Sequence, residues 1–223
     1  DNYFQSSVID FDKDRSDRST YKLLGGSIGF YGSTLNTRQY ATKGYLEKLI
    51  AQVFTGRERF EPGNPQEGYS PSPQERQSWL QISYMKEAYH TMGPKFTLGW
   101  MAEALYSSKN FSENYTATMM QAGEFAPTPH SKLMYNEAFR ANQYVAAGIK
   151  PIYVLNDMFQ FRTEFYGFTP ILPIKKNALN KAYYGKAFSR FEYMGEVSVI
   201  CHLPFGAISA YVNHYSSPRR EWN

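Results

Sequence analysis

Apolar and polar residues alternate with a period of two along several stretches of the chain. In 94–106 the apolar parity carries Phe96, Leu98 and Trp100, while polar or small residues fill most of the other. This pattern makes one face of an extended strand apolar and the other polar. Soluble strands usually have about five or six residues, whereas about nine to eleven tilted residues cross the hydrocarbon core of a membrane. The pattern therefore predicts β-strands of membrane-crossing length.

The spacing between these stretches predicts the topology. We predict nine strands, at 3–11, 20–31, 43–56, 77–88, 94–106, 141–154, 157–168, 187–202 and 207–215. The best helical candidate is a turn or two around 177–182. From the third strand onward, short connections such as 90–93 alternate with long ones such as 107–140, as in outer-membrane barrels. We therefore predict an all-β fold, an antiparallel transmembrane β-barrel in which residues 1–223 are one barrel domain.

The strand count also carries an expectation about completeness. The last predicted strand follows a short turn, and bacterial barrels have an even number of strands. We therefore expect the chain to be the C-terminal part of a longer protein, with the final strand of the barrel after Asn223.

The alternation assigns a face to each residue of the predicted barrel. The residues expected to face lipid are Phe96, Leu98, Trp100, Ala102, Phe159, Phe161, Phe165, Val197 and Val199. The residues expected to face the lumen are Lys95, Glu103, Gln160, Arg162, Glu164, Arg190, Glu192 and Glu196. Charges of both signs on neighbouring strands indicate cross-strand pairs or a hydrated, plugged interior.

Composition fits this interpretation. Aromatic residues make up 17% of the chain, yet the mean hydropathy is -0.54 and no run of 18 apolar residues could form a transmembrane helix. A barrel explains both values, because lumen residues and loops offset the lipid face. A soluble antiparallel β-sandwich, which could bind glycans through Tyr and Trp, also alternates and is the main structural alternative. The net charge of +4 is too small and scattered to indicate a nucleic-acid partner.

One stretch matches a catalytic motif. Gly25–Gly29 reads G-x-S-x-G, which in hydrolases exposes a serine at a sharp turn from strand to helix. The residues that follow, 30–34, are aromatic and Gly-rich rather than helical. An esterase using Ser27 is therefore only an alternative, and we assign no catalytic residue. The sequence shows no metal-ligand spacing and indicates no cofactor.

Several stretches resemble a known family. The entry to the strand at 43–56, Thr34–Tyr45, resembles the "P-T-[KR]-G" strand entry of Omp85-type barrels, with Ala41 where proline is usual. The stretches 115–120, 125–132, 144–153, 195–199 and 203–211 resemble the C-terminal barrel region of patatin-like phospholipases from Bacteroidetes.

The resemblance implies a longer protein with three parts: a periplasmic patatin hydrolase domain, a POTRA-like connector and an Omp85-like barrel in the outer membrane of a Gram-negative bacterium. The family's catalytic pair is an elbow serine and an aspartate in an Asp-Gly turn, and no Asp-Gly turn occurs here. The chain itself would anchor, and export or position, the hydrolase domain.

The expected partners are outer-membrane lipid and the upstream patatin and POTRA-like domains, with association into a homodimer left open. A transport or insertase barrel is the functional alternative.

Overall fold

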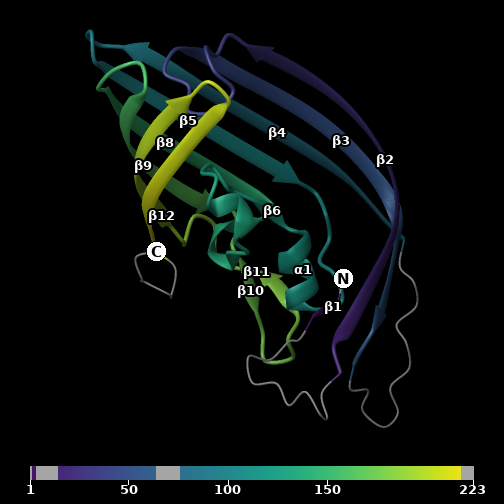
Figure 1. Ribbon diagram of the computed structural model, residues 1–223. Helices are drawn as coiled ribbons and strands as arrows, with labels where there is room; N and C mark the ends of the chain where they lie inside the picture. Colours follow the sequence, from purple (N-terminus) through teal and green to yellow (C-terminus); the bar gives the residue numbers. More distant parts are fainter. Residues whose placement is uncertain (1, 4–14, 64–75, 217–223) are drawn as a thin grey trace.

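The computed structural model describes residues 2–3, 15–63 and 76–216 of the chain. A nine-stranded antiparallel sheet dominates the fold, and each strand pairs with its predecessor and successor in the order β1-β2-β3-β4-β5-β8-β9-β12-β13 (Figure 1). These strands are β1 (Asn2–Tyr3), β2 (Asp17–Ser33), β3 (Gly44–Glu61), β4 (Arg76–Thr91), β5 (Phe96–Ser107), β8 (Gln143–Val154), β9 (Phe159–Pro170), β12 (Glu192–Leu203) and β13 (Gly206–Tyr215). This is the up-and-down meander that the alternation predicts.

The predicted strands from 20–31 to 207–215 all match observed strands. The first one, 3–11, lies almost entirely outside the described residues. The predicted strand at 187–202 begins later than expected, at Glu192, because 187–191 belongs to the preceding connection.

The helix prediction was wrong. Residues 177–182 include the turn between two short strands, β10 (Ile174–Lys176) and β11 (Ala182–Tyr184). The helix α1 (Tyr115–Gln121) lies in the connection after β5 instead. Its N-cap is Asn114, whose side chain accepts a hydrogen bond from the backbone N–H of Ala117 at 2.8 Å.

Short and long connections alternate from β4 onward and sort by sheet end, which confirms this part of the prediction. The prediction began at the third strand, but most of its long connection at 57–76 lies outside the described residues. The connections 92–95, 155–158 and 204–205 are short and lie at one end of the sheet, whereas 108–142 and 171–191 are long and lie at the other (Figure 1). We call these the short-turn end and the long-loop end. The β2–β3 connection at 34–43 also lies at the short-turn end.

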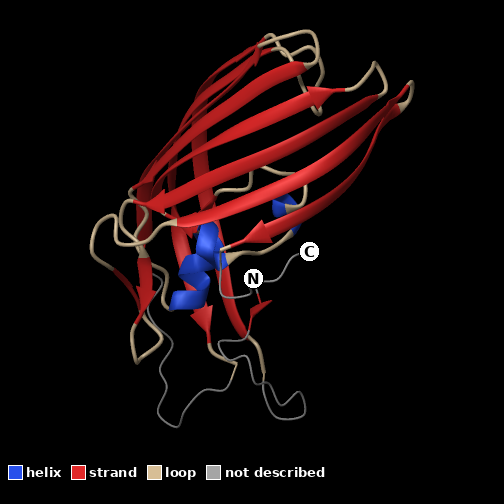
Figure 2. Cartoon of the chain, turned by 90° about the vertical axis from the view of Figure 1, so that its left-hand side faces the viewer, coloured by secondary structure: helices blue, strands red, loops and turns tan. Residues whose placement is uncertain are grey.

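The sheet is strongly curved but open. One edge of the sheet is formed by β1 and β2 and the other by β13. These edges are not paired with each other, so the described residues do not form a closed barrel. On the concave side lies the connection 108–142, which we call the inner segment (Figure 2). It contains α1, β6 (Gly123–Glu124), η1 (Ser131–Leu133), η2 (Glu137–Phe139) and β7 (Arg140–Ala141).

No helix among residues 2–3, 15–63 and 76–216 has the length and apolar character needed to cross a membrane.

The hydrophobic core lies between the inner segment and the sheet. Phe125 and Phe139 of the inner segment are fully buried and contact Phe168 of β9, with ring centroids 5.9 and 5.7 Å apart. Tyr144 of β8 and Tyr215 of β13 complete this aromatic cluster. Burial of these rings holds the inner segment against the concave face.

Candidate functional site

The outer, convex face of the sheet carries the residues that the sequence assigns to lipid. Phe161 is the register partner of both Val199 and Tyr153, so these side chains share one face. Phe165 and Val197 are each 54% exposed. Phe96, Phe159, Phe161 and Val199 are also exposed, and Leu98, Trp100 and Ala102 are half-buried on the same face of β5. The outer face is therefore apolar and open.

The inner, concave face carries most of the residues that the sequence assigns to the lumen. Gln160, Arg162, Glu164 and Glu196 are all buried there. Glu103 is half-buried on the inner face of β5, where its carboxylate accepts a 2.5 Å hydrogen bond from the hydroxyl of Tyr144.

The other three predicted lumen residues lie at the ends of the strands. Lys95 is exposed in the turn before β5, so it takes no part in the inner face. Arg190 precedes β12 and donates to the carbonyl of Ala138 in the inner segment at 2.8 Å. Glu192 is the first residue of β12 and accepts a hydrogen bond from Ser216 at 2.6 Å.

Arg162 is the centre of a buried network on β9. Its side chain is 2% exposed, and its Nε lies 2.9 Å from Oε1 of Glu164. The hydroxyl of Tyr166 donates to the other carboxylate oxygen of Glu164. A guanidinium buried this deeply needs a paired carboxylate and further hydrogen bonds to offset its desolvation. The network supplies both.

A second buried pair extends the network to β4 and β8. Lys150 of β8 lies 2.7 Å from Oε1 of Glu87 on β4, and both side chains are largely buried. The hydroxyl of Tyr89 donates to the same Glu87 carboxylate and lies 3.4 Å from the guanidinium of Arg162. Charged groups from β4, β8 and β9 are thus joined across the interior of the curved sheet.

The β2–β3 connection, 34–43, reaches this network from the short-turn end. Nη1 of Arg162 donates to the carbonyl of Ala41 at 2.9 Å, and Nε2 of Gln160 donates to the carbonyl of Tyr40 at 3.3 Å. The hydroxyl of Tyr40 also donates to Ser209 of β13 at 2.8 Å. The connection therefore spans the concave side from the second strand of the sheet to the last.

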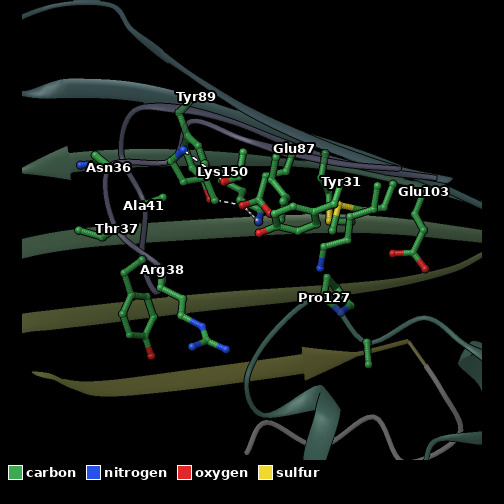
Figure 3. Close-up of a pocket in the computed structure, with 18 of the residues that line it drawn as sticks. Tyr31, Asn36, Thr37, Arg38, Ala41, Glu87, Tyr89, Glu103, Pro127 and Lys150 are labelled. Atoms are coloured by element: carbon green, nitrogen blue, oxygen red, sulfur yellow. Dashed lines mark hydrogen bonds and ion pairs between the residues drawn. The ribbon is translucent and has the colours of Figure 1, made fainter. Parts of the chain in front are cut away.

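A cavity of about 890 Å³ lies between this connection, the inner segment and the sheet. The charged residues of its lining are Arg38, Lys48, Glu87, Glu103, Lys132 and Lys150. Figure 3 shows the guanidinium of Arg38 directed into the space beside Pro127, with Glu103 on the far side. The size is within the range of small-molecule sites, but the lining is polar rather than apolar.

Lys109 joins the inner segment to the first strands. Its ammonium lies 4.9 Å from the ring centroid of Trp79 and 5.3 Å from that of Tyr21, and it donates to Gln121 of α1 at 3.3 Å. Burial lowers the pKa of this ammonium from 10.5 to about 8.

Ser27 does not occupy a nucleophile elbow. It lies in the middle of β2 and pairs in register with Gln52 of β3, and the strand continues to Ser33. The sharp turn into a helix that exposes a nucleophilic serine is absent at this position.

Sequence reasoning missed part of the network. Glu87, Tyr89 and Tyr166 were not singled out, although their strands were predicted. Their positions in the alternation of β4 and β9 indicate the inner face and could have identified them. The sequence does not indicate that Glu87 contacts Lys150, because Lys150 lies on a strand two positions away in the sheet.

Comparisons of the chain with protein-family models, with curated proteins and with solved structures gave no match.

Proposed function

We propose that the curved sheet is part of the wall of an outer-membrane β-barrel, which anchors and positions a patatin-like lipid hydrolase domain located outside this chain. The observation that carries the membrane part is the distribution of polarity. Charged side chains are buried on the concave face beside the aromatic core, while the convex face is apolar and exposed. A soluble protein buries its apolar face and exposes its charges, whereas a membrane barrel has the opposite arrangement.

The dimensions of the apolar face on β2, β3 and β4 support the same proposal. In register, the outer-face rows are Lys22–Arg57–Arg76, Leu24–Thr55–Ser78, Gly26–Val53–Leu80, Ile28–Ala51–Ile82, Phe30–Leu49–Tyr84 and Gly32–Glu47–Lys86.

Charged rows thus bound an apolar band at both ends. They are ten positions apart on β2, from 22 to 32, which is about 33 Å along a strand. At the usual tilt of about 40° this corresponds to a height of about 25 Å, the thickness of the apolar band of outer-membrane barrels.

Closure is a requirement of this proposal. A barrel has no free strand edge, so the edges at β1–β2 and at β13 would have to be paired by further strands. By the usual arrangement of such barrels, the short-turn end would be periplasmic and the long-loop end extracellular.

The anchoring role rests on the resemblance of the sequence to the barrel region of patatin-like phospholipases. The location of Ser27 within β2 is consistent with it, because the hydrolase chemistry would then belong to another domain. Envelope fractionation of cells that express the full-length protein tests this role. Recovery of lipid hydrolase activity with the outer membrane supports it, and recovery in the soluble fraction contradicts it.

A pair of adjacent substitutions tests the membrane proposal directly. Ile28 is 78% exposed at the middle of the outer band, and Ser27 is exposed on the inner face. Ile28→Arg would place a charge at the bilayer midplane, at a cost of about 2–4 kcal/mol, whereas Ser27→Arg would point into the interior.

The readout is folding into lipid vesicles, followed by heat-modifiable migration on a gel. We expect Ile28→Arg to fold poorly and Ser27→Arg to fold like the parent chain. Water solubility without detergent, with both variants equally folded, would contradict the proposal. The same Ser27 variant tests the esterase alternative, which requires loss of any measured hydrolysis.

The inner cavity favours transport as a second candidate function. Its lining carries charges of both signs, as pores often do. Conductance of the complete barrel in a planar bilayer separates the two functions, because a passive anchor is silent.

A further inference from the structure

The outer face carries a row of three cations at the long-loop end. Lys22 of β2 is the register partner of Arg57 of β3, which is the register partner of Arg76 of β4. All three are exposed. Directly opposed residues on one face have Cβ atoms about 4.5–5.5 Å apart, and like charges in this arrangement destabilise a sheet. No ion pair connects any of the three to another described residue.

Hydroxyl groups lie directly beside this row. Thr55 and Ser78 occupy the next outer-face row, with their side-chain oxygens 2.8 Å apart, and Nε of Arg76 donates to Oγ1 of Thr55 at 3.4 Å. A groove of about 410 Å³ is lined by Lys22, Leu23, Leu24, Thr55, Gly56, Arg57 and Arg76. Cations and hydroxyls are the side chains that bind phosphate oxygens.

The surroundings of the groove indicate what carries the phosphate. The neighbouring outer-face residues toward the short-turn end are apolar: Leu24, Val53 and Leu80 are all exposed. A ligand that satisfies both regions has an anionic head and a hydrocarbon tail. The opposite end of the same band differs, because Lys86 there lies 3.6 Å from Glu47 and is already paired.

We propose that Lys22, Arg57 and Arg76 bind the phosphate group of an anionic lipid at the membrane boundary. This inference rests on the proposed membrane location of the outer face. The phosphate neutralises three opposed cations, and the acyl chains lie along the apolar band. By the proposed orientation, the lipid belongs to the extracellular leaflet.

The test measures lipid retention in non-ionic detergent micelles, so it gives an answer whether or not the chain inserts into a bilayer. Micelles are doped with equal amounts of phosphatidylglycerol and phosphatidylcholine, and lipids retained by the purified full chain are quantified by mass spectrometry. We expect the parent chain to retain phosphatidylglycerol preferentially. We expect the triple variant Lys22→Gln/Arg57→Gln/Arg76→Gln to lose this preference by about tenfold or more.

The matched control, Lys43→Gln/Lys86→Gln/Lys95→Gln, removes the same charge at the short-turn end and should keep the preference. Raising the salt from about 0.1 M to about 1 M should weaken retention by the parent chain and by the control, but not by the Lys22/Arg57/Arg76 variant. Equal retention by the parent chain and the Lys22/Arg57/Arg76 variant overturns the proposal, as does equal loss in the control.

Heat-modifiable migration of the same samples in vesicles reports separately on the membrane location. A chain that retains the anionic lipid but never inserts would contradict the proposed function and leave the phosphate site standing. The single variant Arg57→Gln checks for misfolding, because removal of the central repulsion should leave the sheet at least as stable as before.

Discussion

The sheet has two halves, β2–β4 and β5–β13. Both have an apolar outer face, but their inner faces differ greatly. In β9 exposed and buried residues alternate almost perfectly, because the inner segment and the charged network cover its concave side. In β2 nearly every residue from Lys22 to Phe30 is exposed on both faces. The inner segment connects β5 to β8, and its aromatic cluster packs on β8, β9 and β13. Alternation in a sequence thus fixes the two faces, but burial of the inner one depends on what a connection places against it.

The largest effect should come from removing a ring that joins the inner segment to the covered half. Phe139 is 1% exposed between Phe168 and Tyr215, so Phe139→Ala should reduce the free energy of unfolding by about 4 kcal/mol. Phe30→Ala, on the exposed outer face of β2, should cost far less in detergent. Denaturant titration in micelles measures both. Equal losses would mean that the halves do not differ in packing.

Breaking the buried ion pair should have the next largest effect. Arg162→Met leaves the Glu164 carboxylate buried without its partner and should cost about 3 kcal/mol. The double variant Arg162→Met/Glu164→Met should regain most of that loss. Arg59→Met, which breaks an exposed pair with Glu61 in the uncovered half, should cost less than about 1 kcal/mol. Denaturant titration in micelles measures these losses. A large loss of unfolding free energy in Arg59→Met would refute the difference between the buried and the exposed ion pair.

Two glycines should respond with opposite signs. A Cβ at Gly148 of β8 would lie 2.2 Å from the ring of Tyr166, so Gly148→Ala should cost about 2 kcal/mol. A Cβ at Gly26 of β2 would meet nothing within 4 Å, so Gly26→Ala should stabilise the chain by about 0.5 kcal/mol. Thermal or chemical unfolding measures the change in stability of each variant. If both halves were equally packed, the two changes would have the same sign.

The last prediction concerns Lys109, at the boundary between the halves. The pKa of Lys109 is about 8 in the fold and 10.5 ordinarily, so between these values the unfolded chain binds more protons. Titration of Lys109 should therefore leave stability unchanged well below pH 8 and raise it above that pH, by about 1 kcal/mol between about pH 7 and pH 9. Lys109→Met has no ammonium to titrate, so its stability should lack this rise. An identical pH profile for the two chains would place Lys109 in water.

The comparison also shows which parts of the structure were readable from the sequence. Strand positions and faces were predictable, because a period of two needs only local information. The helix α1 was not, because it is short and contains β-branched Thr116 and Thr118, which are weak helix formers. Asn114 before it was the one visible capping signal.

The network was only half predictable. The parity of Arg162 and Glu164 placed them on the inner face, and their contact within one strand follows from their spacing. The contacts of Lys150 with Glu87 and of Arg162 with Ala41 depend on curvature and on the path of a connection. Neither can be read from a local pattern. The open sheet likewise could not be distinguished from a closed barrel by alternation.

The connection at 34–43 has a consequence for the order of assembly. Its contacts with Gln160 and Arg162 join residues about 120 positions apart, and that of Tyr40 with Ser209 spans 169. Contacts of such high sequence separation require the loop between them to be closed first, which makes them slow to form. The meander can grow hairpin by hairpin from neighbouring strands, but this connection reaches its site only after β9 and β13 are in place. We therefore expect this connection to be the last part of the fold to form its native contacts.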